Sequence, residues 1–96
     1  MSIELPSLLP PDELPLSRID QSPPLTVGRC QLLGHNVAAD GKADPVSFDD
    51  QYFIYVYQFG DAFFVVRGLN PEMMEGKEVP AREAEEVLTS LPYRVS

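Results

Sequence analysis

The sequence predicts a small α+β fold: an antiparallel β-sheet centred on a hairpin, one C-terminal helix and an extended N-terminal arm. Two segments rich in aromatic and β-branched residues, joined by Gly60-Asp61, predict the hairpin over 51–67. Apolar residues at helical spacing predict the helix over about 80–91. Residues 1–24 hold six of the ten prolines and none of the nine aromatic residues, so they form the proline-rich arm. Residues 25–96 form a single small domain.

The two-residue connection fixes the register of the hairpin. Glycine at the first position of Gly60-Asp61 is typical of a type II′ turn, which places Gln58 opposite Phe63 and Ile54 opposite Arg67. Successive side chains of a strand point to opposite faces of the sheet. One face then carries Phe53, Tyr55, Tyr57, Phe64 and Val66, and the other carries Tyr52, Ile54, Val56, Phe63 and Val65. Because both faces are apolar, we expect both to be covered.

The helix can cover one of these faces. Pro80 suits the first helical position, Glu83 lies near the positive end of the helix dipole, and Pro92 ends the helix. The apolar stripe of the helix consists of Ala84, Val87, Leu88 and Leu91. The second face needs another cover, which is the arm, a loop that we expect over 69–78, or a second copy of the chain. We therefore expect a docked arm or a homodimer.

Weaker patterns complete the fold. Residues 25–39 offer a third strand: 26–33 has moderate strand character, Gly34-His35-Asn36 marks a bulge or turn, and Val37-Ala38 continue the strand. In the 69–78 loop, Met73 and Met74 stand beside glutamates and serve either core packing or an adaptable contact surface. Three shorter elements are a loop over 40–45, the start of a strand at 46–48 and a short edge strand at 93–95.

The arm carries many leucines, whereas disordered linkers contain few large apolar residues. Two interpretations remain open. In the first, the arm lies across its own domain and covers exposed sheet. In the second, it docks as an extended peptide on another protein. The second interpretation, together with aromatic residues of the sheet, gives the candidate partner-binding residues. They are Leu5, Leu8, Leu9, Leu14, Leu16, Tyr52, Tyr55 and Tyr57.

Charge and composition exclude several classes of protein. The chain has 96 residues, 15 acidic and 7 basic side chains, and a formal net charge of −8, so direct binding to nucleic acid phosphates is not expected. One cysteine rules out an internal disulfide and a multi-cysteine zinc site. No apolar run approaches the roughly 20 residues of a membrane helix. Glu4 and Pro6 interrupt the N-terminal residues, which do not resemble a secretory signal, so we expect a cytoplasmic protein.

No combination of residues predicts a catalytic site, a metal site or a cofactor. Cys30 and His35 are five residues apart in a predicted strand, which places them on opposite faces and argues against a nucleophile–base pair. Four aspartates between residues 40 and 50 crowd one loop region, but their spacing does not match a calcium-binding loop. A glycine-rich phosphate loop is also absent from the sequence.

Two functions fit these properties. The first is a small acidic cytosolic accessory or regulatory protein that is not an enzyme and acts by binding another protein. The alternative is an acidic inhibitor or nucleic-acid mimic that blocks a basic site on a nuclease or another nucleic-acid-binding protein. The two differ in salt dependence: apolar contacts tolerate salt, whereas binding through surface carboxylates weakens as the salt concentration rises.

Overall fold

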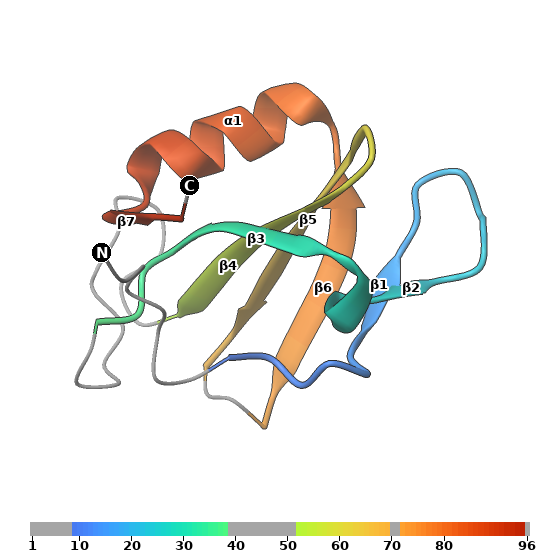
Figure 1. Ribbon diagram of the computed structural model, residues 1–96, viewed down its shortest axis with the longest axis horizontal. Coiled ribbons are helices and arrows are strands. Elements are labelled where there is room, and N and C mark those ends of the chain that lie inside the picture. Colours follow the sequence, from blue (N-terminus) through green and yellow to red (C-terminus); the bar gives the residue numbers. More distant parts are fainter. Residues whose placement is uncertain (1–8, 39–51, 70–71, 96) are drawn as a thin grey trace.

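The computed structural model describes residues 9–38, 52–69 and 72–95. In these ranges the chain forms one seven-stranded sheet, ordered β2-β1-β6-β5-β4-β3-β7, and one α-helix that packs on one of its faces (Figure 1). The elements are β1 (Pro15–Ser17), β2 (Leu25–Thr26), the 3₁₀ turn η1 (Val27–Arg29), β3 (Gln31–His35), β4 (Phe53–Phe59), β5 (Ala62–Gly68), β6 (Met74–Val79), α1 (Ala81–Ser90) and β7 (Tyr93–Arg94). The predicted α+β class is confirmed.

The β4–β5 hairpin has the predicted register. Gln58 lies opposite Phe63 and Ile54 lies opposite Arg67. Gly60 has a φ angle of 60°, while Asp61 does not have a positive φ. This combination matches a type II′ turn, because a type I′ turn needs positive φ at both central residues.

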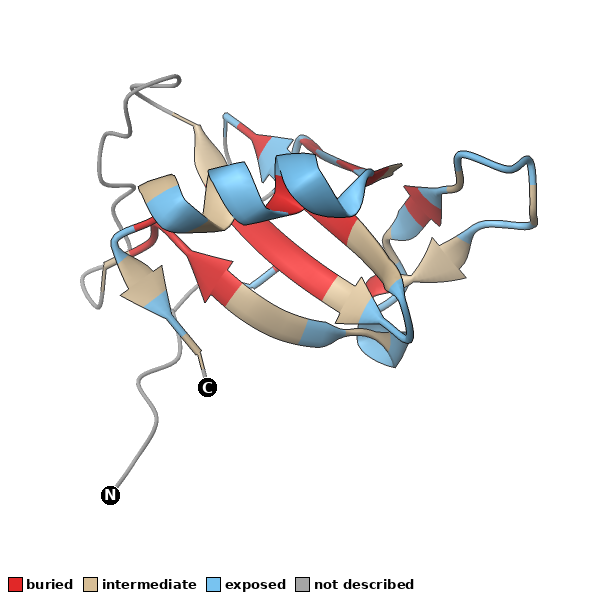
Figure 2. Ribbon diagram, turned by 90° about the horizontal axis from the view of Figure 1, so that it is seen from above, coloured by how far each residue is buried: buried red, intermediate tan, exposed pale blue. Residues whose placement is uncertain are grey.

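The helix covers one apolar face of the hairpin. α1 packs against β5, β4 and β3. Ala84 and Leu91 are buried in one cluster with Ile54, Val56 and Val65. Figure 2 shows α1 lying over the strands, with exposed residues along its outer side. The predicted amphipathic helix is therefore confirmed, although Pro80 is its N-cap residue rather than its first helical residue.

The described part of the arm covers the opposite face. β1 lies within the arm and pairs in parallel with β6 and antiparallel with β2. Leu16 of β1 is fully buried and joins Tyr55, Phe64 and Val66 in a second core cluster. This arrangement agrees with the first interpretation of the arm. Residues 9–24 therefore contribute to the sheet and to its core.

The loop predicted over 69–78 is wrong, because most of it forms β6. This strand lies between β1 and β5. Buried Met74 and Gly76 alternate with exposed Glu75 and Lys77, which is the pattern of a strand with one face toward solvent. Glycine, lysine and glutamate are depleted in strands, so residue preference concealed this element.

The strand predicted within residues 25–39 is confirmed in part, as β2 and β3. η1 interrupts it, and within η1 the N–H of Gly28 donates to the Asp12 carbonyl oxygen at 2.9 Å. The bulge is confirmed: the pairing of β3 with β4 shifts between Leu32 and Gly34.

The edge strand is confirmed as β7. The loop predicted over 40–45 and the strand predicted at 46–48 lie outside the described residues. No helix in the described ranges combines the length and apolar character needed to cross a membrane.

Candidate binding groove

Three of the predicted partner-binding residues lie in the core. Leu16 and Tyr55 are 0% exposed, and Tyr57 is 4% exposed. Burial raises the pKa of both tyrosine hydroxyls. The arm covers the face of the hairpin that carries Tyr55 and Tyr57, so these three side chains pack in the interior.

The other predicted residues have different environments. Leu14 is half-buried and packs against the arm-side core, while Leu9 is 46% exposed. Leu5 and Leu8 lie outside the described residues. Tyr52 is half-buried and lines a groove. Of the six candidates within the described residues, Tyr52 is the one that lines this groove.

The groove has a volume of about 770 Å³ and lies on the helix-side face of the sheet. β1, β5 and β6 form its floor, and residues of the β5–β6 connection form its rim. Because α1 packs over β5, β4 and β3, the part of this face toward β6 and β1 remains accessible. The lining residues are Ser17, Tyr52, Val65, Arg67, Gly68, Leu69, Met73, Met74, Glu75, Gly76 and Lys77.

Strand pairing arranges the charges on the groove floor. Lys77 lies opposite Val65 of β5 on one side and opposite Ser17 of β1 on the other, so neither cross-strand neighbour is charged. Arg67 lies opposite Glu75. Its guanidinium carbon stands 4.7 Å from the centroid of the Tyr52 ring, a cation–π geometry that holds both side chains. The floor therefore presents two cations and one carboxylate.

The rim of the groove is apolar. Leu69 is 51% exposed and Met73 is 65% exposed, whereas the neighbouring Met74 is 8% exposed and belongs to the core. Each of the two roles considered for the methionine pair thus falls to one member: Met74 packs in the interior, and Met73 stands at the surface. Methionine is flexible and polarisable, so Met73 can adapt to different apolar side chains.

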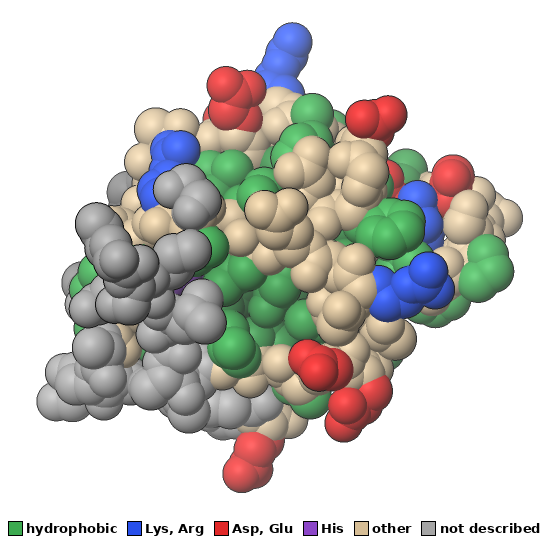
Figure 3. All heavy atoms as spheres, in the orientation of Figure 1, with side chains coloured by type: hydrophobic (Ala, Val, Ile, Leu, Met, Phe, Trp, Pro, Cys, Tyr) green, Lys and Arg blue, Asp and Glu red, His purple; other side chains and the backbone are tan. Residues whose placement is uncertain are grey.

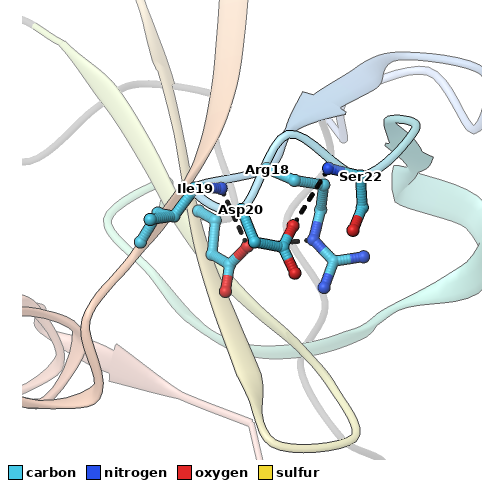
Figure 4. A network of polar contacts seen from close by, with 5 residues as sticks. Arg18, Ile19, Asp20 and Ser22 are labelled. Atoms are coloured by element: carbon cyan, nitrogen blue, oxygen red, sulfur yellow. Dashed lines mark hydrogen bonds and ion pairs between the residues drawn. The ribbon is translucent and has the colours of Figure 1, made fainter.

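A separate polar network holds the β1–β2 connection to β6. Glu78 Oε1 accepts hydrogen bonds from Arg18 Nε at 2.9 Å and from the Ile19 N–H at 3.1 Å (Figure 4). The hydrogen bond to Glu78 raises the pKa of Arg18. Hydrogen bonds from Ser22 lower the pKa of Asp20. This network positions a loop, and it lies outside the groove.

Burial shifts the pKa values of the two residues considered for nucleophilic chemistry in the directions that favour their neutral forms. Burial raises the pKa of the Cys30 thiol, whose Sγ lies 3.6 Å from the Thr26 carbonyl oxygen. Burial lowers the pKa of His35, whose Nδ1 accepts the Val37 N–H at 3.2 Å. A protonated thiol and a weakly basic imidazole are a poor nucleophile and a poor base. Within the described ranges, no three His, Cys, Asp or Glu side chains are grouped to hold a metal ion.

Sequence reasoning missed most of the groove. Arg67 and Lys77 are alternate residues of two paired strands, and the alternation in β5 could have assigned Arg67 to the helix-side face. Lys77 could not be assigned to a face of the sheet, because the sequence pattern over 69–78 predicts a loop rather than β6. No protein-family model matches the chain, no curated protein is significantly similar to it, and no solved structure matches it.

Proposed function

We propose that this protein is a small, non-enzymatic accessory or regulatory protein that acts by binding another protein through the groove. The observation that carries the proposal is the pair of half-exposed apolar side chains, Leu69 and Met73, at the edge of a cavity of about 770 Å³. Exposed apolar side chains grouped at a concave site are typical of interaction surfaces. The described residues that line the groove include no histidine or cysteine, which favours binding over nucleophilic catalysis.

The alternative, an acidic inhibitor or mimic, requires carboxylates gathered on one surface. On the face in Figure 3, the acidic side chains stand at separate places in the upper, right and lower parts of the view, with basic side chains beside some of them. The outer side of α1 does carry exposed Glu83, Glu85 and Glu86, but Arg82 stands beside them. The groove therefore supports protein binding better than the carboxylates support mimicry, and the helix surface provides a comparison site.

Site-specific photocrosslinking tests the proposal. A benzoylphenylalanine residue replaces either Met73 at the groove rim or Thr89 on the outer side of α1, and each variant is irradiated in a lysate of the source organism. We expect a discrete adduct at position 73 that excess unlabelled wild-type protein competes away. Thr89 is the matched control because it is also exposed and lies one turn from Glu85 and Glu86.

The pattern of adducts separates the hypotheses. An adduct at position 89 that disappears at high salt would favour the acidic inhibitor and overturn the proposed groove function. The absence of a competable adduct at position 73 would also overturn it. Because both replaced side chains are exposed, the two variants should keep the fold, which far-ultraviolet circular dichroism verifies.

A further inference from the structure

We infer that the groove takes an extended, acidic and aliphatic segment of the partner protein, with a carboxylate against Lys77 and an apolar side chain between Leu69 and Met73. The inference rests on the proposed function, because it names the chemistry of the partner at the same site. It follows from the charges of the floor, the apolar rim and the position of Lys77 in the sheet.

The charge of the groove differs in sign from that of the whole chain. The protein has a formal net charge of −8, yet the charged side chains that line the groove are Arg67, Lys77 and Glu75. At physiological salt, charges more than about 8 Å apart are largely screened, so the nearest charges decide what binds in the groove. A segment with carboxylates is therefore attracted at this site although the chain as a whole is acidic.

Lys77 is the cation best placed to receive a carboxylate. It is exposed, it stands on the floor between β1 and β5, and its cross-strand neighbours Val65 and Ser17 are uncharged. Within the described residues Lys77 forms no ion pair with a carboxylate, whereas Arg18 pairs with Glu78. Arg67 differs, since it stacks on Tyr52 and lies opposite Glu75.

The rim accounts for the aliphatic part of the segment. Leu69 and Met73 flank the cavity, and burying their exposed apolar surface against an aliphatic side chain stabilises the complex. Aliphatic contact supplies affinity, and the pairing with Lys77 supplies specificity.

Three fluorescein-labelled peptides of equal length provide the test. The first alternates glutamate with leucine, the second alternates lysine with leucine, and the third alternates glutamate with serine. Binding to the full chain is measured by fluorescence anisotropy, and amide shifts in two-dimensional NMR spectra locate the site. We expect the glutamate–leucine peptide alone to bind with shifts around Val65, Leu69 and Lys77.

Charge reversal at two positions isolates the role of Lys77. Lys77→Glu should weaken the glutamate–leucine peptide by about tenfold or more, because an attraction becomes a repulsion. Arg82→Glu makes the same change of charge at an exposed position on α1 and should alter the dissociation constant by less than about twofold. Both substitutions are at exposed positions, and the NMR spectra verify that each variant is folded.

Several results would overturn the inference. These are equal binding of the lysine–leucine peptide, equal effects of the two charge reversals, and failure of all three peptides to shift the groove residues. Shifts at these residues that depend on protein concentration without peptide would identify a second copy as the occupant and also overturn it. An adduct at position 73 that still forms in the Lys77→Glu variant would overturn the inference that the partner binds through an acidic segment. It would leave the proposed protein-binding function intact.

Discussion

Leu16 and Gly76 are direct partners in the parallel pairing of β1 with β6, and the Leu16 side chain occupies the space that a side chain at position 76 would need. A Cβ added at Gly76 would overlap Leu16 Cδ2 and lie 3.1 Å from Val66 Cγ2. The missing side chain at position 76 thus lets a leucine of the arm reach the core. This contact adds to the pairing of Ser17 with Lys77 and the ion pair of Arg18 with Glu78 in joining the arm to β6.

Gly76→Ala should destabilise the protein by about 1–3 kcal/mol, because the added methyl group overpacks a closed part of the core. Urea unfolding followed by circular dichroism measures the change. Glu75→Ala is the control, since Glu75 is exposed and its replacement should cost less than about 0.5 kcal/mol. Equal stability of Gly76→Ala and the wild type would contradict the packing of Leu16 on β6.

Leu16→Ala should cost about 2–5 kcal/mol through the cavity it leaves in the core. Adding Gly76→Ala to Leu16→Ala should then cost much less than in the wild type, because the shortened side chain at position 16 makes room for the methyl group. A double-mutant cycle should give a coupling free energy of about 1 kcal/mol or more, as expected for residues in contact. Strictly additive effects would show that the two positions do not share this space.

The hairpin could be predicted in detail because residues close together in the sequence determine it. Gly60-Asp61 sets the turn, the turn sets the register, and the alternation of side chains assigns each residue to a face. The helix followed from its apolar stripe in the same way. Long-range packing was not available from the sequence, so the choice between a docked arm and a second copy depended on Leu16 meeting Gly76.

The candidate site could be predicted only in part. Tyr52 was identified, but Tyr55 and Tyr57 were assigned to a contact surface that the arm in fact covers. The groove brings together residues from β1, β5 and β6, and its existence depends on how far α1 extends across the sheet. Lys77 was missed because a strand of glycine, lysine and glutamate has little strand preference of its own.

Asn36 continues the pairing between β3 and β4 with its side chain. Its Nδ2 donates to the Tyr52 carbonyl oxygen at 2.7 Å, and its Oδ1 accepts the Ile54 N–H at 2.7 Å. Asn36→Ala leaves both backbone groups without these partners and should cost about 1–3 kcal/mol for each. Urea unfolding measures the loss, and a cost below about 1 kcal/mol would contradict the structural role of the amide.

In the Asn36→Asp variant, the number of these two hydrogen bonds that the side chain can form depends on pH. The ionised carboxylate accepts the Ile54 N–H but cannot donate to the Tyr52 carbonyl oxygen. A protonated carboxyl group can do both. Relative to the wild type, the variant should therefore gain stability as the pH falls through the raised carboxyl pKa expected at this buried position. A stability difference that stays constant with pH would argue against donation to Tyr52.

Glu78 should control the opening of the β1–β2 connection more than the global stability of the protein. Glu78→Gln keeps an oxygen that accepts the Ile19 N–H but loses the charge that pairs with Arg18, whereas Glu78→Ala loses both contacts. We expect amide exchange at Ile19 to be fastest in Glu78→Ala and intermediate in Glu78→Gln. NMR-detected hydrogen exchange measures this order, and identical rates in all three proteins would contradict it.

His35 should make the protein less stable at mildly acidic pH. It is 3% exposed, its ring stacks on Tyr93 at 5.2 Å, and its buried Nε2 has no hydrogen-bond partner among the described residues. Burial lowers the pKa of the folded imidazole below its ordinary value of 6.5, so the unfolded chain takes up the proton first. The stabilisation is therefore complete above about pH 6.5 and is lost as the pH falls toward the lowered folded pKa.

His35→Asn tests this assignment, because the asparagine Oδ1 can accept the Val37 N–H in place of Nδ1 but does not titrate. Unfolding free energies of both proteins are measured in urea between about pH 5 and pH 8, on either side of the ordinary histidine pKa. The carboxylates titrate in both proteins, so the difference between the two curves isolates His35. The wild type should lose stability relative to the variant as the pH falls. Parallel curves would show that His35 accepts its proton as readily in the folded protein as in the unfolded chain.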